Sequence, residues 1–201
     1  MENLDFIKRV KRLFAVALVF FLLGTIQGCG YFNKPSYEGQ VIDYETNEPI
    51  EGASVIATYR SETTTIIAGD ATAIVDVQEA ITDKDGRFFI PPYTSVIYPI
   101  SREGTTLFGI FKPGYYPAGN RSFKGCFTGG ACARQEMWAS PPRERPVLLP
   151  DYVVENGKVG LTKIVSERDR RVLIPSGVHL YESKSPYLMK LINEEYKKIW
   201  N

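Results

Sequence analysis

The chain has 201 residues, of which 44% are hydrophobic and 23% are charged, a composition typical of one globular domain with appendages. Its 24 Lys and Arg residues are balanced by 23 Asp and Glu residues, which excludes a strongly basic nucleic-acid-binding protein. The single histidine, His179, argues against histidine-rich metal sites and His-based catalytic clusters, and we expect no cofactor.

The first 28 residues have the layout of a secretory signal peptide. A basic segment at residues 8–12 precedes an unbroken apolar run at residues 13–23. The whole apolar stretch, residues 13–26, has 14 residues, whereas a membrane-spanning helix needs about 20. We therefore expect a signal helix that is removed, and an uncleaved membrane anchor is the alternative.

The four residues that follow the apolar run, Ile-Gln-Gly-Cys at positions 26–29, resemble the lipobox of bacterial lipoproteins. The resemblance implies that Cys29 receives a diacylglycerol thioether, that the signal is cut before it, and that the new amine is acylated by a fatty acid such as palmitate. Two or three acyl chains make a stable membrane anchor, whereas one chain binds only marginally. The alternative is an ordinary signal cleavage site with an incidental cysteine.

Gly30 follows the lipobox cysteine. In the Gram-negative lipoproteins that this segment resembles, aspartate at that position retains the protein in the inner membrane, so Gly30 implies the outer membrane. Residues 29–36 are expected to be a lipidated tether, because Pro35 disfavours a helix. Removing residues 1–28, which carry four basic and two acidic residues, changes the net charge from +1 to −1, so the anchor depends on the acyl chains.

Residues 37–150 alternate short strand-like segments with turns. The expected strands are 37–43, 53–59, 87–90, 106–111 and 146–149, and turn chemistry occupies 44–50 and 82–86, where Gly86 suits a positive φ. Small or apolar residues at positions 53, 55, 57 and 59 repeat with a period of two, which indicates a strand with one buried face. The pattern favours an antiparallel β-sandwich. The expected core residues are Val41, Val55, Ala57, Phe88, Ile90 and Ile110.

Three motifs in this segment resemble the carboxypeptidase regulatory-like domain. They are G-Q-V-I-D at 39–43, P-I-E-G-A-S-V at 49–55 and T-D-K-D-G-R-F at 82–88. The resemblance implies a mainly β fold, a transthyretin-like (prealbumin-like) antiparallel Greek-key β-sandwich over residues 37–150. It also implies a non-catalytic companion domain. Residues 61–78 are an insertion relative to that family, and their Thr and Ile content predicts additional β structure.

Cys126 and Cys132 are the other two cysteines, and the five residues between them include two glycines. In an oxidising envelope compartment we expect a disulfide between them. Two free buried thiols, or half of a metal site, are the alternatives. Hydroxyisourate hydrolases share the transthyretin-like sandwich but use paired histidines, whereas this chain has one histidine. The chain also has neither a G-x-S-x-G nucleophile elbow nor a phosphate-cradling glycine loop. We therefore expect no catalytic residues and no enzyme activity.

Residues 151–201 are expected to be a C-terminal extension. Asn156-Gly157 is typical of a type I′ hairpin turn. Ser185-Pro186 begins an amphipathic helix at about 186–200, with Ser185 as N-cap. Its buried side would carry Leu188, Leu191, Ile192, Glu195 and Ile199. The helix either docks on the sandwich or contacts an envelope protein partner.

Together these features predict a non-catalytic, membrane-anchored envelope lipoprotein whose β-sandwich is a structural or binding module. Its expected contact with the membrane is the lipid on Cys29, and no nucleic acid is expected. One alternative is an accessory subunit of an envelope complex. The other is a secreted carbohydrate- or peptide-binding domain.

Overall fold

The structure is a computed structural model of the whole chain. It describes residues 11–13, 16, 18, 30–65, 69–98, 101–123, 125–137, 149–166, 170 and 184–200. The strands in these ranges are β1 (Gly30–Lys34), β2 (Tyr37–Asp43), β3 (Ser54–Thr65), β4 (Gly69–Ile81), β5 (Arg87–Ile90), β6 (Tyr93–Ile97), β7 (Ser101–Glu103), β8 (Leu107–Phe111), β9 (Ala118–Arg121), β10 (Gln135–Met137), β11 (Tyr152–Glu155) and β12 (Lys158–Leu161). The helix α3 spans Pro186–Trp200.

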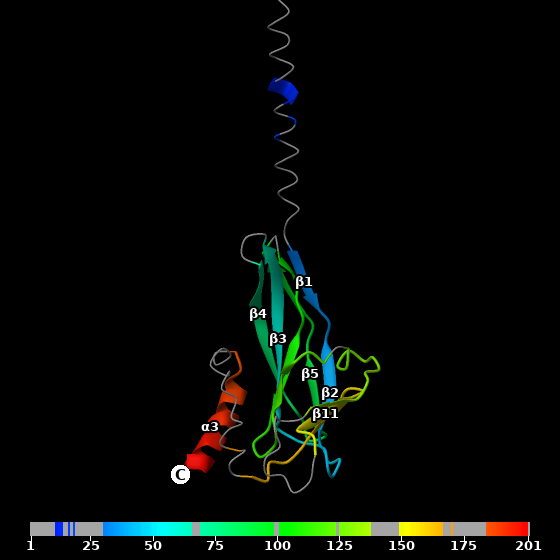
Figure 1. Cartoon of the computed structure of the whole chain (residues 1–201), viewed down its shortest axis with the longest axis vertical. Coiled ribbons are helices and arrows are strands. Elements are labelled where there is room, and N and C mark those ends of the chain that lie inside the picture. The colour runs from blue at the N-terminus through cyan, green and yellow to red at the C-terminus, as the bar shows by residue number, and fades with distance from the viewer. Residues whose placement is uncertain are drawn as a thin grey trace, which may run out of the picture.

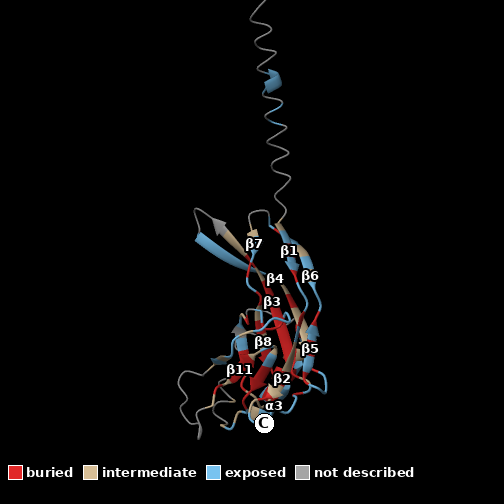
Figure 2. Ribbon diagram, turned by 90° about the vertical axis from the view of Figure 1, so that its right-hand side faces the viewer, coloured by how far each residue is buried: buried red, intermediate tan, exposed pale blue. Residues whose placement is uncertain are grey.

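Besides a two-stranded sheet of β1 and β6, two five-stranded sheets pack around one hydrophobic core, so the predicted mainly β, sandwich-like fold is confirmed at that level (Figure 1). One sheet has the order β10-β11-β12-β2-β5 and the other β4-β3-β8-β9, with β7 also paired to β3. These pairs are antiparallel except that β12 runs parallel to β2. All six predicted core residues are buried, and Figure 2 shows the buried band between the sheets. They are Val41, Val55, Ala57, Phe88, Ile90 and Ile110.

The turns form where the sequence predicts them. Gly86 has a φ of +70°, and a Cβ at this position would lie 2.3 Å from the carbonyl oxygen of Val41, so only glycine fits. In the following strand β5, Phe88 is buried and Phe89 is exposed, as the period of two requires. Asn156 and Gly157 both have positive φ between β11 and β12, which matches the predicted I′ hairpin.

The expected tether at residues 29–36 is wrong for residues 30–34, which form strand β1. β1 pairs antiparallel with β6, so that Gly30 faces Ile97 and Lys34 faces Tyr93. Pro35 does exclude a helix, but an extended chain can still pair with a strand. Here the pairing lets Phe32 become fully buried and Lys34 almost fully buried. Among the described residues β1 is the first strand, and its first residue, Gly30, follows Cys29 directly in the sequence.

The sheet that contains β2 continues beyond residue 150 into the segment predicted as an extension. β11 and β12 lie between β10 and β2, and their Val154, Val159 and Leu161 are completely buried in the main core. Burial of these side chains is the physical reason why the hairpin belongs to the sheet. Most of the predicted strand at 146–149 lies outside the described residues, and Leu149 is not in a strand.

Strand β3 is buried on both faces between Ser54 and Tyr59. Its inner face carries Val55, Ala57 and Tyr59, as the sequence pattern predicts. Its outer face is covered by α3, where Leu188, Leu191 and Ile192 pack on Ile56, Val77 and Phe111. Docking of the helix on the sandwich is thus confirmed.

β3 also pairs with β4 as far as Thr65–Gly69, which confirms β structure in the described part of the 61–78 insertion.

The N-terminus of α3 is stabilised from the neighbouring sheet. The Glu79 carboxylate on β4 accepts hydrogen bonds from the backbone N–H groups of Tyr187 (3.0 Å) and Leu188 (2.7 Å). These are two of the donors that a helix leaves unpaired at its first turn. The helix begins at Pro186 as predicted.

Within the predicted signal peptide the structure describes residues 11–13, 16 and 18, which are helical. Their apolar side chains, Leu13, Val16 and Leu18, are exposed. Cys29 and His179 lie outside the described residues. In the part of the chain that is described, no helix is long and apolar enough to span a membrane.

Candidate functional site

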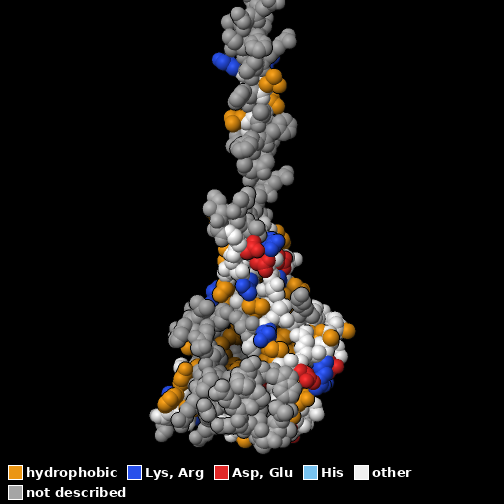
Figure 3. Space-filling view, viewed as in Figure 1, with side chains coloured by type: hydrophobic (Ala, Val, Ile, Leu, Met, Phe, Trp, Pro, Cys, Tyr) orange, Lys and Arg blue, Asp and Glu red, His pale blue; other side chains and the backbone are white. Residues whose placement is uncertain are grey.

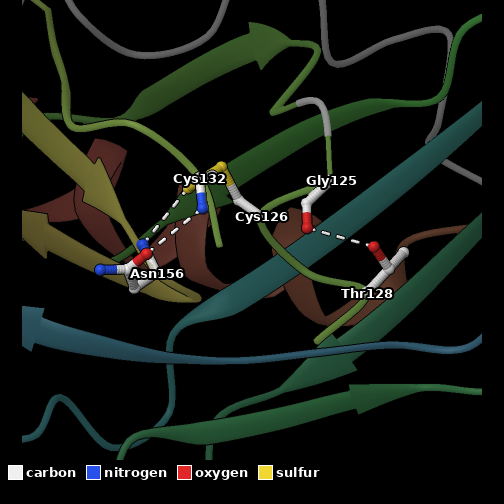
Figure 4. The surroundings of a disulfide bond; sticks show 5 residues. All are labelled: Gly125, Cys126, Thr128, Cys132 and Asn156. Carbon is white, nitrogen blue, oxygen red and sulfur yellow. Dashed lines mark hydrogen bonds between the residues drawn. A yellow bond between two sulfur atoms is a disulfide. The ribbon is translucent and has the colours of Figure 1, made fainter. Parts of the chain in front are cut away.

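Cys126 and Cys132 form a disulfide, in agreement with the prediction, with their Cα atoms 5.0 Å apart (Figure 4). The bond closes a loop that is also held by hydrogen bonds. The backbone N–H of Cys132 donates to Oδ1 of Asn156 (3.2 Å), and the N–H of Asn156 points back at the Sγ of Cys132. The loop is therefore fixed to the β11–β12 turn, as Figure 4 shows.

The residue after Cys126 ties the loop to the core. Phe127 is buried, and its ring makes edge-to-face contacts with Phe88, Phe108 and Phe123 at centroid distances of 4.9–5.5 Å. Its carbonyl oxygen accepts a hydrogen bond from the N–H of Glu38 on β2 (2.9 Å). The loop is thus an integral part of the sandwich and not an appended ring.

A surface groove of about 690 Å³ is lined by this loop and by β2 and β5. Residues 38–40 of β2 and 87–89 of β5 line it together with Asp83, the disulfide loop and the β11–β12 turn. The lining residues that carry side-chain chemistry are Glu38, Gln40, Asp83, Arg87, Phe89 and Lys158. Gly39 allows the close approach of the turn, because a Cβ there would lie 2.7 Å from the carbonyl oxygen of Gly157.

The groove offers both an aromatic surface and charges of both signs. Phe89 is 58% exposed although it is a large apolar side chain. Part of the polar lining is occupied within the fold: Asp83 Oδ1 accepts from the N–H groups of Asp85 and Arg87, and Gln40 Nε2 donates to the carbonyl oxygen of Asp85. Arg87, Glu38 and Lys158 have charged ends suited to contacts with a ligand.

The described lining of this groove contains no pairing of a nucleophile with a base, because its one cysteine, Cys126, is in the disulfide. Nor do the described residues contain a group of three or more His, Cys, Asp or Glu side chains that could hold a metal ion. The groove residues offer a ligand aromatic contact, hydrogen bonds and ion pairs.

A separate polar cluster surrounds Asp43 at the end of β2. Its Oδ2 accepts from Lys163 Nζ (2.9 Å) and Tyr115 Oη (3.1 Å), while Oδ1 accepts from the N–H groups of Glu45 and Thr46. Burial alone would raise the pKa of Asp43, but these hydrogen bonds outweigh it and hold the pKa below its ordinary value. The cluster fixes the turn after β2 and joins it to the segment after β12.

Sequence reasoning identified the two cysteines but not the groove beside them. Cys29, the predicted lipidation site, lies outside the described residues. The groove residues come from β2, β5 and two turns that are distant in the sequence, so no local motif marks them. The one local signal is Phe89, an aromatic residue on the outward side of a strand whose other face is apolar.

Comparisons of this chain with protein-family models, with curated proteins and with solved structures found no match. The resemblances to lipoprotein signals and to the carboxypeptidase regulatory-like domain therefore stay predictions that depend on the motifs themselves.

Proposed function

We propose that this protein is a non-catalytic envelope lipoprotein, anchored by acyl chains on Cys29. The observation that carries the proposal is where the fold begins. β1 starts at Gly30, directly after the lipobox cysteine, while the described apolar side chains of residues 13, 16 and 18 stay exposed and pack on no part of the sandwich. Removal of residues 11–13, 16 and 18 would leave both hydrophobic clusters of the sandwich intact, which is what lipoprotein processing requires.

We also propose that the sandwich is a transthyretin-like Greek-key module of the carboxypeptidase regulatory-like kind. The support is that its three motifs lie in strands and in the turns that lead into strands. Residues 39–43 are in β2, residues 49–55 lead through a turn into β3, and residues 82–88 form the turn that enters β5. An experimental structure with a different order of strands would overturn this assignment.

The groove between β5 and the disulfide loop is the proposed binding surface of the module. It combines an exposed aromatic ring with charged groups, and the disulfide and Phe127 hold its wall in place. In the accessory-subunit alternative, α3 would instead contact a partner through its exposed Tyr196 and Trp200. In the secreted-domain alternative the same groove would bind a carbohydrate or peptide, and Cys29 would carry no lipid.

Placement in the outer membrane is proposed from Gly30, but the packing of β1 also explains why a glycine occupies this position. A Cβ at Gly30 would lie 2.8 Å from Cγ1 of Ile97 and 3.1 Å from the carbonyl oxygen of Ser101. Gly30→Asp and Gly30→Ser both add this Cβ, and only the aspartate carries the retention signal. Membrane fractionation should therefore move Gly30→Asp to the inner membrane and leave Gly30→Ser in place. The same location for both variants would contradict sorting by this position.

Metabolic labelling with a fatty-acid analogue tests the anchor. Wild-type protein should carry the label, and Cys29→Ala should lose it together with signal cleavage, because only the thiolate of Cys29 can accept the diacylglycerol. Cys29→Ala protein that is still processed and labelled would refute the lipobox assignment. Unlabelled wild-type protein in the culture medium would favour the secreted-domain alternative.

Two matched aromatic substitutions test whether the groove or the helix α3 is the binding surface. Phe89→Ala removes the exposed ring in the groove, and Tyr196→Ala removes an exposed ring on α3. Crosslinking in intact cells, followed by purification, should show adducts that Phe89→Ala loses and Tyr196→Ala keeps. The reverse pattern would assign binding to α3 and support the accessory-subunit alternative.

A further inference from the structure

Three exposed apolar or aromatic side chains gather where the fold begins. They are Tyr31 on β1, Val96 on β6 and Tyr98 just after β6, with exposed fractions of 70%, 66% and 76%. Tyr31 and Val96 are direct partners in the β1–β6 pairing, so their side chains lie on the same outward face. Tyr98 follows Ile97, the partner of Gly30. We call this set the anchor-end face.

The anchor-end face is fixed to the body of the sandwich. On the opposite side of β1, Phe32 is fully buried and makes edge-to-face contacts with Tyr59 and Tyr93 at 6.1 Å. Lys34 Nζ donates to the carbonyl oxygen of Gly104 (2.8 Å). The contacts of Phe32 and Lys34 fix β1 on the sandwich. The anchor-end face therefore keeps a fixed position relative to Gly30.

The length of chain between Cys29 and this face is very short. Tyr31 is two residues from Cys29, which is about 7 Å at most along an extended chain. The polar headgroup layer on each side of a bilayer is about 5–8 Å thick. An acylated Cys29 would therefore hold Tyr31, and with it Val96 and Tyr98, at the depth of the headgroups of the same membrane.

The charged groups at this end of the sandwich do not oppose such a contact. Figure 3 shows acidic and basic side chains close together there, and two ion pairs join β1 and β3 to β7. Arg102 Nε lies 3.2 Å from Glu62 Oε2, and Lys34 Nζ lies 2.6 Å from Glu103 Oε1. These two pairs are neutral, and the exposed Asp70 at the start of β4 adds a negative charge, so the face has no marked attraction to anionic lipid and suits zwitterionic headgroups.

We propose that the anchor-end face is a membrane-contact surface that inserts Tyr31, Val96 and Tyr98 among phospholipid headgroups. Tyrosine is suited to this layer, because its ring is apolar and its hydroxyl can remain hydrogen-bonded to water or headgroups. The inference rests on the proposed acylation of Cys29. It adds that the body lies directly against the bilayer in a fixed orientation, with α3 and the end of β2 directed away from it (Figures 1 and 2).

Depth-dependent fluorescence quenching tests the proposal on the complete lipidated protein in phosphatidylcholine vesicles. Val96→Cys gives one free thiol for a fluorophore, since the other cysteines are in the disulfide or are acylated. Val165→Cys is the matched control, because Val165 is also exposed but follows β12 at the far end of β2. Phospholipid that carries a doxyl quencher near its headgroup should quench position 96 severalfold more than position 165.

The possible outcomes distinguish failure of the membrane-contact surface from failure of the lipid anchor. Equal quenching at the two positions, in protein that floats with the vesicles, would overturn the membrane-contact surface and leave the lipid anchor intact. Protection of position 96 from aqueous iodide without quenching by doxyl lipid would indicate a protein neighbour and would also contradict the proposal. Protein that carries no lipid and does not float would refute the anchor and this inference together.

Discussion

The side-chain amine of Lys34 lies 2.6 Å from Oε1 of Glu103 and joins the first strand of the fold to β7. The amine is almost fully buried and stands 5.0 Å from the centre of the Phe32 ring. The Lys34 amine has its hydrogen-bond acceptor and its opposite charge only while β1 is folded onto the sandwich, because both partners lie some 70 residues further along the chain. This contact makes β1 part of the sandwich.

Lys34→Met should loosen β1. It removes the ion pair with half-exposed Glu103 and the buried hydrogen bond to Gly104, and we expect local stability to fall by about 1–3 kcal/mol. Hydrogen exchange of the β1 amides should quicken accordingly. Lys84→Met, at an exposed turn, should leave exchange in β1 unchanged. Unaltered β1 protection in Lys34→Met would show that Phe32 alone holds the strand.

Glu79→Ala should weaken the start of α3. The substitution leaves the N–H groups of Tyr187 and Leu188 without their carboxylate acceptor, a change comparable to loss of an N-cap, about 1–2 kcal/mol. Hydrogen exchange in the first turns of α3 should quicken most. Glu194→Ala, an exposed glutamate on the same helix, is the control and should do little. Equal effects of the two variants would mean that apolar packing alone positions α3.

Asp43 should make stability depend on acid pH. Its pKa is lowered in the folded protein from an ordinary value of 3.8, so the unfolded chain binds the proton first as pH falls. The stabilisation is therefore fully present above that ordinary value and is lost as pH falls through the lower folded pKa. Asp43→Asn should destabilise at neutral pH by about 2 kcal/mol.

The comparison of wild type with Asp43→Asn checks this sign. The difference in their melting temperatures should be largest near neutral pH and should shrink below about pH 4, where the unfolded wild-type chain begins to bind the proton while folded Asp43 is still ionised. A constant difference across the acid range would show that Asp43 acts through its shape and hydrogen bonds and not through its charge.

Cys132→Ser should leave the sandwich folded and lower its stability by about 2 kcal/mol at most. Phe127 stays buried among the aromatic rings, so the loop keeps one end in the core while its Cys132 end loosens. Mass spectrometry of native protein under non-reducing conditions should show the loop peptide lighter by two hydrogens than the dithiol form. Two alkylatable thiols in freshly isolated protein would contradict the bond.

Local patterns predicted the elements whose stabilising contacts are close in sequence or repeat regularly. The period of two at residues 53–59 marks the inner face of β3, Gly86 marks a turn with positive φ, and Pro186 begins α3. In each case the residue type is restricted by backbone geometry or by one buried face, and both restrictions are readable from a single short segment.

The features that the sequence did not predict depend on partners far away along the chain. From the sequence alone, Phe32 and Lys34 are predicted to belong to a short tether. Their contacts with Tyr59, Tyr93 and Glu103, which show that they belong to the fold, depend on strand pairing. Glu79 caps a helix 109 positions later, with nothing local to indicate it. The groove likewise assembles from four separated segments. Such contacts follow from the pairing of strands, which periodicity alone does not specify.

Intact-mass spectrometry of the protein purified from its membrane fraction tests the central claim most directly. The predicted result is a chain that begins at Cys29, lacks residues 1–28 and carries a diacylglycerol and an amide-linked fatty acid. A chain that begins elsewhere, or one that begins at Cys29 without added lipid, would contradict the account of a folded body attached to the membrane through the residue before β1.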